Sequence, residues 1–196
     1  MNTTSILGSH ARTRLPMVSS CSKKSFLVTI KMAVAVFQNE IKGEVLVHSW
    51  ERGLFLKAYF SQLPEGKHGL HIHKAGDLRG GGCAGMCEHF DTGHNNHGGE
   101  PGSTSERHTG DLGNIEVNQI KWYFLQDLRL EDIWGRSVVI HADEDDLGKG
   151  GLADSKTTGH SGARIGCAIF GRCSDQCAKG DRPTAQLVDA SRRSHK

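Results

Sequence analysis

The sequence has little of what marks several large classes of protein. Only 4 of its 196 residues are proline and aromatic residues make up 6%. No apolar run approaches the roughly 20 residues that a membrane-spanning helix requires. The formal net charge is only +2, which excludes a strongly basic nucleic-acid-binding chain and an acidic solvating one. Six cysteines are too few for a disulfide-dense secreted domain, and no apolar h-region of a secretory signal is present. We therefore expect a cytoplasmic protein that binds neither nucleic acid nor membrane.

Glycine and histidine are abundant instead, with 25 and 12 residues. The glycines follow no collagen period, and with so few prolines they indicate a turn-rich β fold with long ordered loops. Strand-like runs cover 32–37, 44–50, 54–60, 68–76, 118–130, 136–141 and 163–171. They predict an all-β antiparallel sandwich or barrel. Glycines, histidines and acidic residues collect in two stretches without strand patterns, 76–111 and 142–162, and loops of that length are typically functional.

The chain divides into three parts by composition. Residues 1–31 contain five Lys or Arg and no Asp or Glu, which predicts a basic, disordered N-terminal extension. A mitochondrial presequence is the less favoured alternative for this extension, and Met32 is an alternative start residue. Residues 32–173 form the predicted domain, and residues 174–196 form a polar C-terminal tail.

Seven histidines fall between positions 68 and 108. His71 and His73 are spaced i, i+2, so on a strand both imidazoles lie on one face and form half of a site suited to zinc or copper. Three further imidazoles and a carboxylate follow in a glycine-rich stretch and suffice for a closed, structural zinc site. These residues are His89, His97, His108 and Asp111. His141, at the end of its strand, can return to the face of the first pair.

Six motifs make the resemblance to a known family specific. They are HGLHIH, GCAGMCEHF, NNHGG, ERHTGDLGN, GRSVVIHADEDDLGKGG and TTGHSGARIGC. In order and spacing these motifs resemble those of the Cu/Zn superoxide dismutases of eukaryotic and viral type, over about residues 32–173. The resemblance implies a Greek-key β-barrel or sandwich with a metal-binding loop and an electrostatic loop.

The resemblance also implies two metal sites that share one histidine. Copper would be held by His71, His73, His89 and His141, and zinc by His89, His97, His108 and Asp111. His89 would bridge the metals as an imidazolate, which is plausible between two cations. The implied enzyme is an antioxidant oxidoreductase. Cu(II) oxidises one superoxide to O2, and Cu(I) reduces a second to hydrogen peroxide.

Further roles follow from the same resemblance. Asp145 would accept N–H bonds from a copper ligand and a zinc ligand and so fix both rings. Arg164 would attract superoxide to the copper channel and, with His89, act in catalysis. Cys83 and Cys167 would form the disulfide within the subunit.

The sequence departs from the family pattern in ways that bear on partners and rate. Ala75 stands where the family often has an aromatic residue at the dimer contact, so we expect a homodimer with an altered interface. Lys156 lies one residue early in the electrostatic loop, which predicts weaker anion steering. Ile165 stands where some members carry proline. This favours disulfide formation without a copper chaperone.

Two other functions remain open on the residues. Cys83-x3-Cys87 and Cys173-x3-Cys177 can be read as a four-thiolate zinc module without redox activity. A copper-transfer protein on the same fold is the third interpretation, although no CxxC motif is present. The remaining histidines are predicted to lie at the surface, except that His68 can pin a loop. These surface histidines are His10, His48, His94, His160 and His195.

Overall fold

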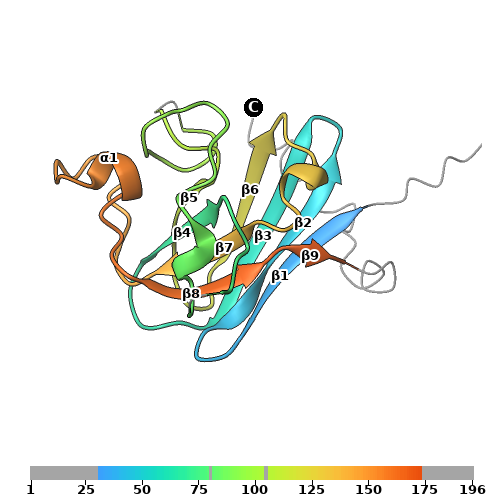
Figure 1. The fold of residues 1–196 in the computed structure, drawn as a ribbon, viewed down its shortest axis with the longest axis horizontal. Helices are drawn as coiled ribbons and strands as arrows, with labels where there is room; N and C mark the ends of the chain where they lie inside the picture. Colours follow the sequence, from blue (N-terminus) through green and yellow to red (C-terminus); the bar gives the residue numbers. More distant parts are fainter. Residues whose placement is uncertain (1–30, 80, 104–105, 174–196) are drawn as a thin grey trace, which may run out of the picture.

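The computed structural model describes residues 31–79, 81–103 and 106–173, and within them two antiparallel sheets face each other (Figure 1). The five-stranded sheet has the order β6-β3-β2-β1-β9, and the four-stranded sheet has the order β5-β4-β7-β8. The strands of the first sheet are β1 (Met32–Gln38), β2 (Lys42–Trp50), β3 (Gly53–Gln62), β6 (Ile120–Gln126) and β9 (Gly171–Arg172). Those of the second are β4 (His68–His73), β5 (Asp111–Ile115), β7 (Ser137–His141) and β8 (Arg164–Ile169). The chain crosses between sheets after β3, β5, β6 and β8, which confirms the predicted Greek-key sandwich.

The core lies between the sheets and follows from alternation along the strands. Ala33, Ala35 and Phe37 on β1 are buried, and Val45 and Val47 on β2 point to the same side. Successive side chains of a strand point to opposite faces, so each strand contributes every second residue to the core. β4 differs, because all six of its residues are buried. Its outer side is covered by the long loops, and this is the side on which the metal ligands lie.

Two strand predictions were too long. The run 68–76 ends as a strand at His73, and the run 118–130, predicted as one or two strands, forms the single strand β6 between Ile120 and Gln126. Strand β5 was not predicted at all. Its sequence DLGNI contains Gly113 at φ +72° and lacks the β-branched alternation of the other strands. Pairing with β4 therefore decides its conformation, rather than local propensity.

The two long loops extend from one side of the sandwich, coloured green and orange in Figure 1. The first carries the 3-10 turn η1 (Ala84–Met86), and the second carries the short helix α1 (Ser155–Thr158). A second 3-10 turn, η2 (Leu130–Asp132), lies between β6 and β7. The extensions 1–30 and 174–196 lie outside the described residues. Among the described residues, no helix has the length and apolar character needed to cross a membrane.

Candidate metal centre

Strands β4 and β7 and the first long loop bring four imidazoles together. His71 and His73 come from β4, and His141 ends the neighbouring strand β7. A register irregularity between β7 and β8 falls at Ile140/His141. His89 follows η1 and forms an isolated bridge with His73, which brings its ring centroid within 4.0 Å of that of His71. The sequence-predicted copper group is thus assembled from three separate segments.

The hydrogen bonds of these rings leave one nitrogen of each ring directed at the others. His71 Nε2–H donates to Asp145 Oδ2 at 2.7 Å, and His73 Nδ1–H donates to the Cys87 carbonyl at 2.9 Å. His141 Nδ1–H donates to the Gly162 carbonyl at 3.2 Å. A neutral ring that donates through one nitrogen carries a lone pair on the other. Those other atoms are buried without a hydrogen-bond partner among the described residues: His71 Nδ1, His73 Nε2, His89 Nε2 and His141 Nε2.

Four buried lone pairs that converge form a group that can hold a cation. Ligand atoms of the four histidines all lie within 4.8 Å of one another. Burial, followed by repulsion from His89, lowers the pKa of His73 to about 2. Burial likewise lowers the pKa of His141 to about 4, against a hydrogen bond to the Gly162 carbonyl that raises it. The rings are therefore neutral near pH 7, and neutral imidazole is the form that binds a transition metal. An all-nitrogen set of this kind suits copper.

A second group surrounds one oxygen of Asp111 on β5. Asp111 Oδ1 lies 2.8 Å from His89 Nδ1, 3.0 Å from His97 Nδ1 and 3.3 Å from His108 Nδ1. A tetrahedral zinc site with ligand bonds of about 2.0–2.1 Å separates its ligand atoms by about 3.3 Å. Asp111 Oδ2 is occupied separately, because it accepts backbone N–H bonds from Gly98 at 3.1 Å and His108 at 2.8 Å. The turn from His108 to Asp111 therefore aims one carboxylate oxygen at three imidazoles.

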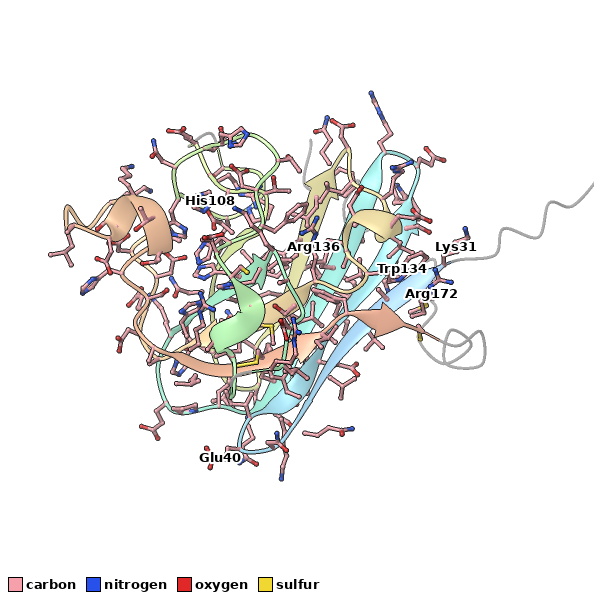
Figure 2. The ribbon with its side chains drawn as sticks, in the orientation of Figure 1. Lys31, Glu40, His108, Trp134, Arg136 and Arg172 are labelled. Atoms are coloured by element: carbon pink, nitrogen blue, oxygen red, sulfur yellow. A yellow bond between two sulfur atoms is a disulfide. The ribbon has the colours of Figure 1, made fainter. Side chains whose placement is uncertain are left out.

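The tautomer of His97 decides between a hydrogen-bonded cluster and a metal site. Its Nε2–H donates to Asp145 Oδ1 at 2.8 Å, so in the neutral ring Nδ1 carries a lone pair. That lone pair faces Asp111 Oδ1 at 3.0 Å, and two acceptors at this distance repel each other unless a proton or a cation lies between them. The residues therefore fit a bound zinc ion. His108, which is labelled in Figure 2, is the most exposed member of this cluster, with a side chain that is 15% exposed.

The same hydrogen bonds shift the pKa values of Asp111 and His97. Burial raises the pKa of Asp111, but hydrogen bonds from His108, His89 and His97 outweigh it and hold that pKa well below its usual range. Burial lowers the pKa of His97, but hydrogen bonds to Asp111 and Asp145 raise it to about 9. A metal ion that binds here displaces that proton, so metal affinity falls as the pH falls.

Asp145 joins the two groups. Its Oδ2 accepts from His71 and its Oδ1 accepts from His97, so the predicted outer contacts to both rings are present. Asn114 on β5 holds this loop, since its Oδ1 accepts the Asp145 N–H at 2.7 Å and its Nδ2 donates to the Asp145 carbonyl at 2.8 Å. Asn114 was not among the predicted site residues, although it closes the motif ERHTGDLGN. The groups are adjacent, because ligand atoms of His71, His89, His97 and Asp111 also lie within 4.8 Å of one another.

Arg164 begins β8 opposite His141 and reaches back over the first long loop. Its Nη1 donates to the Cys83 carbonyl at 2.9 Å, and its Nη2 donates to the Cys87 carbonyl at 2.5 Å. The predicted disulfide joins Cys83 to Cys167 and appears as a yellow bond in Figure 2. Because that bond occupies Cys83, the four-thiolate zinc module is not supported.

The histidines outside the two groups have structural or surface positions. His68 is buried, and its Nδ1 lies 2.9 Å from the His141 carbonyl, which supports the expectation that it pins a loop. His94 and His160 are exposed, as predicted. His48 was predicted at the surface, and this was wrong, because it is buried on β2. His10 and His195 lie outside the described residues.

Fold and geometry define a β-sandwich protein with a paired, histidine-rich metal centre. Residues 41–170 match the sequence model of copper/zinc superoxide dismutase (SODC). "Superoxide dismutase [Cu-Zn]" of Paramecium bursaria Chlorella virus 1 is 42% identical over 147 residues, covering 71% of this chain and 77% of the relative. "Superoxide dismutase [Cu-Zn] 3" of Arabidopsis thaliana is 44% identical over 126 residues, covering 61% and 75%. The crystal structure of the clock protein EA4 superposes with a TM-score of 0.61 at 33% identity, covering 72% and 93%. The chain belongs to the copper/zinc superoxide dismutase family.

Proposed function

We propose that the protein converts two superoxide anions and two protons into O2 and hydrogen peroxide, as a copper/zinc superoxide dismutase. The observation that carries the proposal is the convergence of four partnerless imidazole nitrogens beside the three imidazoles around Asp111 Oδ1. His89 belongs to both sets, because Nε2 faces the first and Nδ1 faces the second. A closed nitrogen–oxygen set suits structural zinc, while an all-imidazole set suits copper.

When bound, copper would supply the one-electron chemistry, because it can cycle between Cu(II) and Cu(I). The residues of the chain hold the rings and handle the protons. Asp145 fixes His71 through Nε2–H, and the Cys87 carbonyl fixes His73 through Nδ1–H, so neither ring can rotate. In our proposal His89 Nε2 takes up and releases a proton in each cycle, while Nδ1 stays beside Asp111.

Arg164 binds and orients the anion. Two backbone carbonyls hold its guanidinium beside the His141 end of the copper group. A fixed positive charge at the mouth of a buried site attracts a small anion and raises its encounter rate. The electrostatic loop adds fewer cationic contacts than the family pattern, because Lys156 is displaced by one residue. We therefore propose that Arg164 provides most of the steering.

We further propose a cytoplasmic homodimer whose disulfide forms without a copper chaperone. Ile165, which stands where some relatives carry proline, supports the last point and is partly exposed on β8. Expression with and without the chaperone should give equal disulfide content. A strict requirement for the chaperone would contradict this part of the proposal, and size-exclusion chromatography with light scattering tests the dimer.

The central experiment measures dismutation and metal content on one sample of full-length protein. We expect about one copper and one zinc per chain. His141→Ala should abolish dismutation and copper binding while sparing zinc, whereas His94→Ala, which removes an exposed histidine, should change neither. Arg164→Ala should lower the rate and flatten its dependence on salt. Zinc without copper, or a loaded sample without dismutation, would overturn the proposal, and copper binding without catalysis would favour a copper-transfer protein.

A further inference from the structure

The outward face of the five-stranded sheet is apolar along its β6 edge. The outward side of a sandwich sheet is ordinarily polar. Here the cross-strand pairs on that side are Phe55 with Phe124 and Lys57 with Trp122. Trp122 is 46% exposed, Phe124 is 37% exposed, and Ile120 on the same strand is 54% exposed. Three consecutive outward positions of an edge strand are thus large, apolar and open to water.

Three aromatic rings on this side are in contact, and the Lys57 ammonium lies 5.9 Å from the ring centroid of the neighbouring Trp122. Trp50 packs edge-to-face on Phe55 with ring centroids 5.6 Å apart, and Phe55 lies 4.9 Å from Phe124. We call Trp50, Phe55, Ile120, Trp122 and Phe124 the outer aromatic face. Contiguous apolar surface of this kind marks a contact site rather than scattered exposure. Nearer β1 the outward-facing Met32 and Leu46 are only 6% and 4% exposed, although Val36 farther along β1 is 45% exposed.

A small hollow lies at the Trp50 end of the outer aromatic face. Its volume is about 210 Å³ and it is lined by Trp50, Glu51, Arg52, Phe124 and Gln126. Small-molecule sites usually measure roughly 300–1,000 Å³. The hollow is therefore closer in size to a single inserted side chain than to a free ligand.

The N-terminal extension enters the described structure at this end of the sheet. The Lys31 carbonyl accepts hydrogen bonds from the backbone N–H of Ser49 at 3.2 Å and from its hydroxyl at 3.3 Å. Trp50 follows directly and pairs with Gly53, which pairs in turn with Gln126 at the end of β6. The start of β1 and the arrowheads of β2 and β6 accordingly lie at the same end in Figure 1, and Figure 2 labels Lys31 there.

The residues that precede Lys31 are long enough to cross the outer aromatic face and are apolar like it. Four of residues 25–30, with the sequence SFLVTI, are apolar. Three strand spacings separate β1 from β6, which amounts to about 14 Å, while six extended residues reach about 20 Å. We propose that residues 25–30 pack across the outer aromatic face and place an apolar side chain in the hollow. The face is then a docking site for the chain's own extension and not for a second copy.

Photocrosslinking of the full-length chain tests this contact. A benzophenone amino acid in place of Leu27 should crosslink to peptides containing Trp50 or residues 119–127, identified by mass spectrometry. A mixture of isotope-labelled and unlabelled chains separates crosslinks within a chain from those between chains. The matched control carries the same group in place of Asn2, outside the apolar segment, and should yield about tenfold less of these products.

Substitutions on the face distinguish docking from chance proximity. Trp122→Lys should reduce the crosslink about tenfold, since it replaces an apolar contact with a charge. Leu78→Lys alters an equally exposed apolar residue away from the five-stranded sheet and should leave the yield unchanged. Circular dichroism checks that each variant is folded. Crosslinks only between chains would assign the face to a second copy, and a yield no higher than that of the Asn2 control would show that the extension does not cover it. Either result overturns the proposal.

Discussion

Replacement of Asp145 by asparagine perturbs both metal groups through one side chain. Each carboxylate oxygen accepts one imidazole N–H, from His71 at 2.7 Å and from His97 at 2.8 Å, and Oδ1 also accepts the Leu147 N–H at 2.7 Å. An amide keeps one accepting oxygen, but its NH2 group then meets a ring N–H. Two donors cannot bond, so one ring has to change its tautomer and lose the lone pair that faces the metal.

The size of the effect follows from the number of contacts that are lost. Removal of an outer partner of a metal-binding histidine lowers metal affinity about 10- to 100-fold, which equals about 1.4–2.7 kcal/mol. Asp145 supports a histidine in each group, and asparagine can keep only one of the two contacts, so we expect a loss in this range for at least one of the two metals. The carboxylate is fully buried, so solvent does not weaken the contact.

Competition with chelators of known affinity measures both constants on the full-length variant. Asp143→Asn is the matched control, because it removes the same charge from an exposed side chain two residues earlier in the loop. The control should stay within about twofold of the wild type. If Asp145→Asn binds both metals as tightly as this control, the reasoning about the tautomers is refuted.

Three further predictions concern the loops around the centre. The hydrogen bond that His160 Nδ1–H donates to Asp154 Oδ1 raises the pKa of His160, so an NMR titration should give a midpoint above 6.5 that returns towards 6.5 in Asp154→Asn. This pair stabilises the fold fully below pH 6.5 and less as the pH rises through the folded pKa. Cys87 has φ 58° and ψ −151°, a backbone conformation that glycine adopts readily and other residues adopt only with strain. Cys87→Gly should therefore raise the free energy of unfolding by about 1 kcal/mol in denaturant titrations, whereas Cys87→Ser should leave it unchanged. Cys167→Ser opens a disulfide that spans 84 residues and should lower the free energy of unfolding by about 4–5 kcal/mol, and a reductant should bring the wild type to the same value.

The clustering of the candidate ligands could be predicted in part because residue types and spacing carry information about which side chains share a face. An i, i+2 histidine pair on a strand fixes a common face, and the turn from His108 to Asp111 fixes two ligands in three residues. The strands with regular alternation, such as β1 and β3, were predicted close to their observed bounds. The burial of His48 could not be predicted, because whether an outward-facing position on a sheet is covered depends on segments distant in sequence.

Long-range backbone contacts were also beyond prediction. The carbonyl of Cys87 accepts hydrogen bonds from His73 and Arg164, and these three residues belong to three different segments. Every residue type offers a backbone carbonyl, so the sequence does not mark this contact. The same holds for β5, whose pairing with β4 supplies the order that its own sequence lacks. Contacts that depend on the backbone leave little trace in composition or spacing.

The segment from Cys83 to His89 connects the disulfide, Arg164 and the copper group. Cys83 is covalently tied to β8 next to Arg164, and its carbonyl accepts from that arginine. Four residues later the Cys87 carbonyl holds both Arg164 and His73, and His89 follows after one more residue. We therefore expect reduction of the disulfide to loosen the carbonyls that hold Arg164, the proposed anion-binding residue, and His73, a proposed copper ligand. Stability and activity should then fall together when the bond is broken, even though neither sulfur atom belongs to the metal groups.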